Sequence, residues 1–151
     1  MKNINEYLNN IPTGVRWSLI LPAGILGFLI IELLGALLTK FNIPSHYISL
    51  FSNLAGHSIF VLFGAIVAPK YRFGIALALT IIVVIISTVS IFFIIKDYLM
   101  IEDLVPSGDK NITNSLKSII EIEMIGKILA IIGSGYITLF VRNHEDKLKQ
   151  I

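Results

Sequence analysis

Three ionisable side chains stand inside long apolar segments of this sequence: Glu32, His57 and Lys127. A carboxylate and an imidazole placed together can titrate near neutral pH, and an ammonium group can pair with the carboxylate. A charged group within an apolar segment of membrane length is expensive, so such groups usually face the interior of a helix bundle and one another. These residues are therefore the first candidates for chemistry in the chain.

The three residues share one depth if each apolar segment is a helix that crosses a membrane. At the rise of an α-helix, Glu32 lies roughly 21 Å from Ser18, where its segment begins. Val141 ends the fourth segment on the same side of the membrane as Ser18, and Lys127 lies roughly 21 Å from it. His57 lies roughly 18 Å from Pro69, the end of the second segment on that side. The sequence therefore predicts one polar layer, somewhat outside the midplane.

Two uncharged polar residues extend this layer. Asn53 lies one turn from His57 on the same face, and Ser87 reaches the same level in the third apolar segment. The predicted polar layer thus consists of Glu32, His57, Lys127, Asn53 and Ser87.

The layer has a functional and a structural interpretation. As a site, it would be a proton relay, an ion-coordinating constriction or a polar substrate pocket. As architecture, a Glu32–Lys127 pair would fix the register of the helices. Each residue also has a local alternative, in which Lys127 reaches outward beside Glu123, Glu32 is protonated, and His57 is a satisfied interior histidine.

Composition sets the class of protein. The chain has 151 residues, of which 55% are hydrophobic and 15% charged, and its mean hydropathy is +0.82. Soluble domains carry about a quarter charged residues. These values exclude a disordered tail, a coiled coil and a water-soluble enzyme, and they indicate a small protein embedded in a lipid bilayer.

Residue counts exclude several kinds of site and partner. There is no cysteine, so disulfides, iron–sulfur clusters and cysteine zinc sites are excluded. The three histidines lie far apart in the sequence, and no metal or other cofactor is expected. A net charge of +2 is too small to indicate a nucleic-acid partner.

Four segments are long and apolar enough to cross a bilayer, which takes about 20 residues per helix. They cover residues 18–39, 47–69, 73–95 and 119–141, and residues 96–118 are predicted to form an outer loop. Within that loop, residues 106–109 carry a turn signal, and Ser118 with Glu121 is typical of a capping box that opens the fourth helix. The chain is thus predicted to be a single all-α domain, a bundle of four transmembrane helices.

The distribution of Lys and Arg predicts the orientation. With the N-terminus in the cytoplasm, seven positive residues lie inside and four outside, which favours an N-in/C-in topology. The inner residues are Lys2, Arg16, Lys70, Arg72, Arg142, Lys147 and Lys149, and the outer ones are Lys40, Lys96, Lys110 and Lys117. The abundance of Ile, Asn and Lys is typical of an AT-rich bacterial genome, so a bacterial inner membrane is expected.

Small residues spaced by four positions predict where the helices pack. The second span offers Gly56 and Gly64, and the fourth offers Gly126 and Ala130. The central part of the third span has almost none. We therefore expect the first, second and fourth spans to form the tight core and the third to face lipid.

No catalytic motif accompanies these features, since the sequence lacks a phosphate-binding glycine loop, a nucleophile elbow and a cluster of metal ligands. The leading hypothesis is a non-enzymatic protein that translocates protons, ions or a small solute. Four helices enclose little space, so a pore would need a homo-oligomer. The alternatives are a structural or accessory subunit that packs against a larger membrane-protein partner, and an intramembrane enzyme built on Glu32 and His57.

Overall fold

The structure, a computed structural model, describes residues 8, 10–104 and 110–149, and this part of the chain is helical and contains no strand. Four stretches are long and apolar enough to cross a membrane: Ile20–Phe41, Ser45–Val67, Arg72–Met100 and Asn114–Glu145. The prediction of an all-helical chain with four spans is confirmed.

The chain begins with the short helix α2 (Thr13–Ser18), which leads into the first span, α3 (Ile20–Leu38). A single 3-10 turn, η1 (Thr39–Phe41), connects it to the second span. That span consists of α4 (Ser45–Phe51), the π-helical segment η2 (Ser52–Gly56) and α5 (His57–Val67). Two long helices follow, α6 (Arg72–Leu104) and α7 (Lys110–Lys149).

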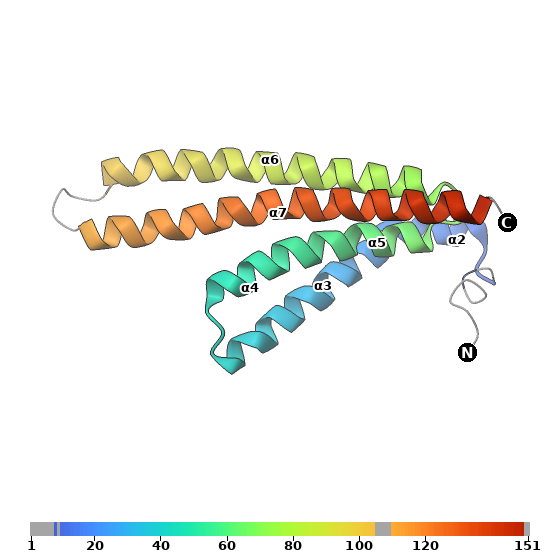
Figure 1. The fold of residues 1–151 in the computed structure, drawn as a ribbon, viewed down its shortest axis with the longest axis horizontal. Helices are drawn as coiled ribbons and strands as arrows, with labels where there is room; N and C mark the ends of the chain where they lie inside the picture. The colour runs from blue at the N-terminus through green and yellow to red at the C-terminus, as the bar shows by residue number, and fades with distance from the viewer. Residues whose placement is uncertain (1–7, 9, 105–109, 150–151) are drawn as a thin grey trace.

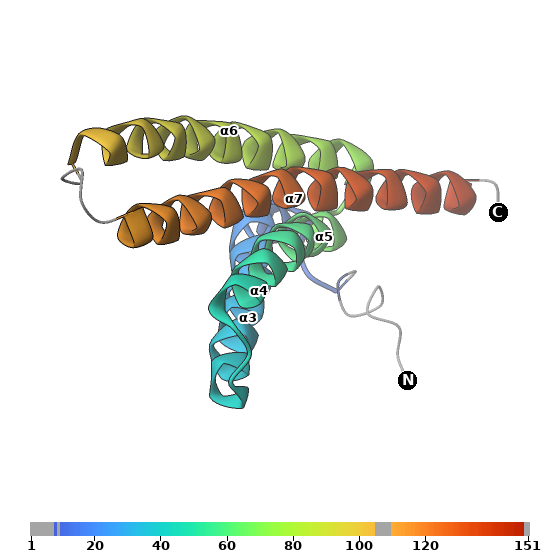
Figure 2. The ribbon, with the colours of Figure 1, turned by 60° about the vertical axis from the view of Figure 1, so that its left-hand side comes forward.

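The helices form two hairpins that meet at one end and diverge at the other. Helices α6 and α7 run side by side along their length, whereas α3 packs on α4, η2 and α5 (Figure 1). The hairpin of α3 with α4, η2 and α5 contacts α7 through α4, η2 and α5, whereas α3 turns away from the α6–α7 pair toward the η1 turn (Figure 2). The molecule is therefore a wedge that is packed at the end holding α2.

The packed end contains a core to which all four spans contribute. Its buried apolar residues are Ile20, Val61, Ala65, Ala68, Ala76, Leu79, Val83, Ala130 and Val141. Most of these side chains are small or β-branched, which lets helix backbones approach closely in lipid. The packing residues predicted from the sequence, Gly56, Gly64, Gly126 and Ala130, are all buried.

Hydroxyl groups join α6 to α7 near this core. The hydroxyl oxygens of Thr80 and Thr138 lie 2.6 Å apart, and Thr138 also donates to the carbonyl of Ala76 at 3.3 Å. At the end of the pair, the Glu145 carboxylate accepts a 2.9 Å bond from the backbone N–H of Phe73, in the first turn of α6. The α6–α7 pair is thus the most extensive helix contact, contrary to the expected peripheral position of the third span. That span nevertheless has the lowest buried share of the four, 22%.

Arg16 closes the packed end from the side of α2. Its guanidinium is buried and donates to the carbonyls of Val67 and Ala68, both at 3.1 Å, where α5 has no further N–H to offer them. Burial of the guanidinium and the neighbouring charge of Arg72 lower the pKa of Arg16, but an arginine stays protonated in proteins. The sequence indicated only a cytoplasmic charge here.

Helices α6 and α7 extend further than predicted, so the loop expected over 96–118 is wrong for most of its length. Helix α6 continues to Leu104 and α7 begins at Lys110, before the predicted cap at Ser118, whose hydroxyl instead bonds back to Ser115. The turn predicted at 106–109 lies outside the described residues. Hydropathy indicates which residues suit the bilayer, and it carries no signal for how far a helix continues beyond them.

Gly24 tests the close packing of α3 on α5. A Cβ at this position would lie 2.9 Å from the carbonyl oxygen of Phe60, a backbone atom that cannot easily move. We expect Gly24→Ala to destabilise the protein by about 1–3 kcal/mol, measured as thermal unfolding of the full chain in nonionic detergent. Gly135→Ala is the matched control, because nothing lies within 4 Å of its Cβ. Equal unfolding temperatures for the two variants would contradict this packing.

Arg16 allows a second test. Arg16→Met leaves the Val67 and Ala68 carbonyls without their charged donor, and we expect a loss of about 2–4 kcal/mol in unfolding free energy. Lys40→Met, at the exposed η1 turn, removes the same charge without a buried partner and should change stability by less than about 0.5 kcal/mol. A loss of similar size in both variants would mean that net charge, rather than the cap, is responsible.

Candidate functional site

A groove of about 520 Å³ lies where the two hairpins diverge. Its polar lining comes from three spans and consists of Glu32, Asn53, His57, Lys127 and the serines 45, 49 and 52. Phe28, Ile48 and Ile86 supply apolar wall. Ile86 is the central residue of the Arg72–Met100 span, so the groove is level with the middle of that helix.

The π-helical segment η2 sits at the centre of the groove and carries Asn53. A π-helical turn inserts an extra residue into a helix, shifts the side chains that follow it, and occurs frequently at functional sites. The side chain of Asn53 bridges two spans, because its Nδ2 donates to the Ser49 carbonyl at 2.9 Å and its Oδ1 accepts from Lys127 Nζ at 3.2 Å. Asn53 therefore fixes the position of the ammonium group.

Gly126 makes room for this contact. A Cβ at residue 126 would lie 2.9 Å from Nδ2 of Asn53 and 3.2 Å from its Cγ. The absence of a side chain one position before Lys127 thus lets η2 and α7 approach closely enough for the amide to reach the ammonium.

His57 presents one ring nitrogen to its own helix and keeps the other available. Its Nδ1 lies 2.8 Å from the backbone carbonyl of Asn53, and a carbonyl oxygen can only accept, so Nδ1 carries a proton. In the neutral ring, Nε2 then retains its lone pair. The Phe28 ring packs on the imidazole edge to face at 5.3 Å and holds its orientation.

Glu32 is exposed on α3 and lines the groove without joining the Asn53 network. Within the described residues, neither the expected Glu32–Lys127 salt bridge nor the alternative pair with Glu123 forms, and Lys127 bonds to Asn53 instead. The groove thus contains a carboxylate and an ammonium that face the same space from different helices.

Ser87 does not join the other four polar residues. It is fully buried on α6, its hydroxyl has no hydrogen-bond partner within the described part of the chain, and it does not line the groove. The structure therefore brings together Glu32, Asn53, His57 and Lys127 from the predicted layer and places Ser87 elsewhere.

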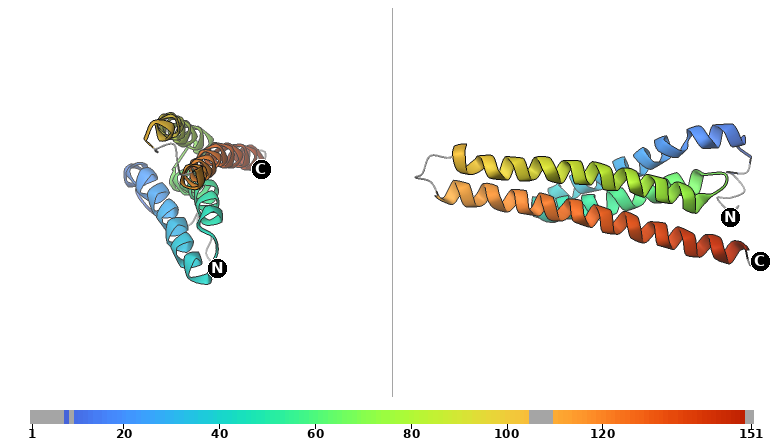
Figure 3. Two further views of the ribbon diagram at one scale, coloured as in Figure 1. Left: turned by 90° about the vertical axis from the view of Figure 1, so that its left-hand side faces the viewer. Right: turned by 90° about the horizontal axis from the view of Figure 1, so that it is seen from above.

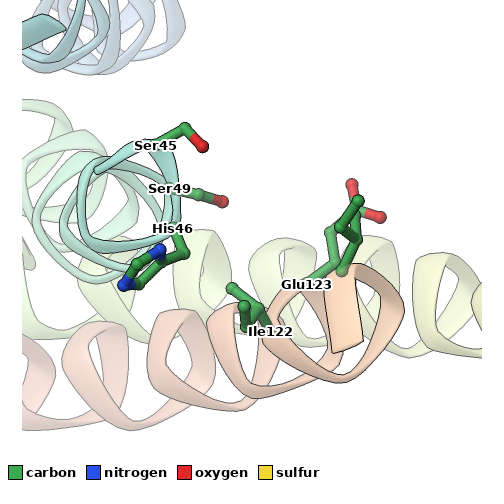
Figure 4. A pocket seen from close by; sticks show the side chains of 6 residues that line it. Ser45, His46, Ser49, Ile122 and Glu123 are labelled. Atoms are coloured by element: carbon green, nitrogen blue, oxygen red, sulfur yellow. The ribbon is translucent and has the colours of Figure 1, made fainter. Parts of the chain in front are cut away.

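A second cavity, of about 220 Å³, adjoins the groove and lies between the start of α4 and residues 119–123 of α7. Ser45 and Ser49 line both spaces, and His46, Ile122 and Glu123 line the second one (Figure 4). Figure 4 shows the two serine hydroxyls pointing to the side of α4 on which Glu123 lies. A row of polar groups thus leads from the end of the helices to Lys127.

Sequence reasoning missed the serines that lead into the groove. Ser45, Ser49 and Ser52 recur at intervals of three and four residues, the spacing of one helix face, and that face also carries Asn53. This spacing could have predicted a polar face leading to Asn53. The apolar walls Phe28 and Ile86 carry no such signal, because nothing distinguishes them from residues that face lipid.

Comparison of the chain with protein-family models, with curated proteins and with solved structures found no match. What the groove can do therefore has to follow from its own side chains. The described residues contain no cluster of three potential metal ligands. A fixed ammonium, a carboxylate and a free imidazole nitrogen can instead bind a charged or hydrogen-bonding solute and exchange protons with it.

The contact between Asn53 and Lys127 can be measured by a double-mutant cycle. We expect Asn53→Ala and Lys127→Met each to lower stability, and the double variant to lose less than the sum, with a coupling of at least about 0.5 kcal/mol. The matched cycle pairs Glu32→Gln with Lys127→Met and should be additive, because these residues are not in contact. Thermal unfolding in nonionic detergent gives both values, and coupling in the Glu32 cycle alone would contradict this geometry.

Proposed function

We propose that this chain is a multi-pass membrane protein that moves an ion or a small polar solute through the groove between its two hairpins. The observation that carries the proposal is the convergence of Glu32, Asn53, His57 and Lys127 on one groove at the middle of four apolar spans. Ionisable residues at such a depth are costly to bury in lipid and characteristically mark the pathways of ions and substrates.

The shape of the molecule supports a route with one open and one closed end. The core around Val61 and Ala130 fills the space between the helices on the side of α2, and Arg16 caps the end of α5 there. On the other side, the second cavity connects the groove to the ends of α4 and α7. The arrangement corresponds to a carrier open to one face of the membrane.

The orientation follows from the distribution of positive charge. We propose an N-in/C-in topology in a bacterial inner membrane, because Lys and Arg are more numerous on the α2 side and in the turn between α5 and α6. In this orientation the packed end faces the cytoplasm and the groove opens outward.

A homo-oligomer would complete the route. Helices α3 and α6 both line the groove, but α3 packs on the second span (Figure 3) and not along α6, so these two helices do not close this side of the groove against each other. We propose that a second copy of the chain covers this side during transport.

A second candidate, an accessory subunit of a larger membrane complex, is favoured by the length of the α6–α7 pair. These helices have 33 and 40 residues, whereas about 20 cross a bilayer. Their ends therefore extend beyond the bilayer and offer a docking surface for a partner.

Flux through proteoliposomes tests the leading proposal. The full chain, reconstituted alone, should conduct protons or monovalent cations, or take up small solutes from a panel of cationic, anionic, zwitterionic and neutral compounds. We expect Glu32→Gln to lower that flux at least about tenfold, because it removes the carboxylate from the groove. Glu121→Gln, on an exposed carboxylate of α7 that lines neither cavity, is the matched control.

Two results would contradict the proposal. One is the absence of flux for every compound with folded protein at two pH values, which would favour the accessory subunit. The other is equal flux for wild type and Glu32→Gln, which would place the route outside the groove.

A further inference from the structure

The groove holds two opposite charges that do not neutralise each other. Lys127 extends from α7 and is held by the neutral amide of Asn53 at 3.2 Å, while Glu32 stands on α3. Helix α3 packs on the second span and not along α7, so the two residues line one groove from different helices. Both are far from the helix ends, where water would otherwise compensate them.

This arrangement selects among the classes of ligand. A simple cation would be attracted to Glu32 and repelled by Lys127, and a simple anion would meet the reverse. A neutral solute would leave both charges uncompensated in a region of low dielectric constant, where that is costly. A molecule with an ammonium at one end and an anionic group at the other compensates both charges at once.

The anionic end has more donors available than Lys127 alone. An ammonium has three N–H groups, and Asn53 occupies one of them, which leaves two for a phosphate or carboxylate oxygen. Ser49 lines the same groove, and its hydroxyl can donate a further bond. The Glu32 carboxylate, which also lines the groove, can accept a bond from an ammonium of the ligand. Phe28 and Ile86 provide apolar surface in the same groove.

The open side between α3 and α6 admits two sources of such a molecule. A free solute enters through the second cavity, past Ser45 and Ser49. A lipid places its headgroup in the groove while its acyl chains stay against the apolar outer surfaces of α3 and α6, where Leu29, Leu33 and Ile82 are exposed.

The geometry points to a binding site for a zwitterionic group, with its ammonium at Glu32 and its phosphate or carboxylate at Lys127 and Asn53. This assignment rests on the proposed function and deepens it, since it names the chemical class that the groove carries. Its test is binding, which is measured without transport.

The experiment uses the purified full chain in a nonionic detergent and follows ligand-dependent thermal stabilisation to obtain dissociation constants. One arm adds phosphatidylethanolamine, and the other adds soluble glycerophosphoethanolamine, which has the same head without acyl chains. Phosphatidylglycerol supplies a phosphate without an ammonium, and ethanolamine supplies an ammonium without a phosphate. We expect one of the two zwitterions to bind at least tenfold more tightly than either single-charge probe, and the arm that binds identifies the source.

Substitutions then assign the two ends. Glu32→Gln and Lys127→Gln should each weaken binding of the zwitterion at least tenfold, whereas Glu121→Gln should leave it unchanged. Glu32→Asp keeps the charge and should restore most of the affinity. If a variant does not fold, the comparison of linked and single-charge probes on the wild-type protein still decides the question.

Three results would overturn the assignment. They are the absence of stabilisation by either zwitterion, equal binding of phosphatidylglycerol with no effect of Glu32→Gln, and equal losses in Glu121→Gln and Glu32→Gln. Flux of protons or cations that depends on Glu32, without binding of a zwitterion, would leave the proposed function standing and remove only this ligand class.

Discussion

The structure depends on the close approach of the second span to its neighbours on two sides. In lipid there is no hydrophobic force between helices, so they associate where small residues let backbones come together. Gly24 admits Phe60 on the α3 side, and Gly126 admits Asn53 on the α7 side. The second span therefore lies between α3 and α7 and holds both, while α3 and α7 do not pack along each other.

The groove is a consequence of this arrangement. A helix held on opposite faces keeps its two neighbours apart, and the space between them widens where α3 turns away from the α6–α7 pair (Figure 2). At the packed end, the core and the Arg16 cap fill the same space. The open half thus contains the groove with Glu32, His57 and Lys127, and the closed half contains the small apolar core with the Arg16 cap.

The sequence was sufficient to predict the helices and the grouping of four polar residues around one groove, but not the partners of these residues. A rise per residue places Glu32, His57 and Lys127 at one level because depth depends only on position along a helix. Which side chain meets which depends on the rotation and tilt of each helix, and these are set by packing that one sequence does not reveal. The π-helical turn at Ser52–Gly56 adds a rotation that no helical wheel anticipates, and Ser87 is buried on α6 and does not line the groove. The extended ends of α6 and α7 were missed because hydropathy indicates which residues suit the bilayer and does not indicate where a helix ends.

The group that contacts Lys127 bears on whether the polar residues serve only to fix the helices or are also suited to binding a ligand. A carboxylate in contact with the ammonium would cancel its charge, and the pair would then serve mainly to fix the helices. Asn53 instead holds the ammonium by one hydrogen bond while remaining neutral, and its own amide is anchored on the Ser49 carbonyl. Lys127 thus keeps both its charge and two free N–H groups directed by a fixed neighbour. Glu32, on α3, likewise lines the groove without a salt bridge to any described residue. Within the described residues Glu32 and Lys127 thus form no salt bridge with each other, and the proposed zwitterion site rests on this separation.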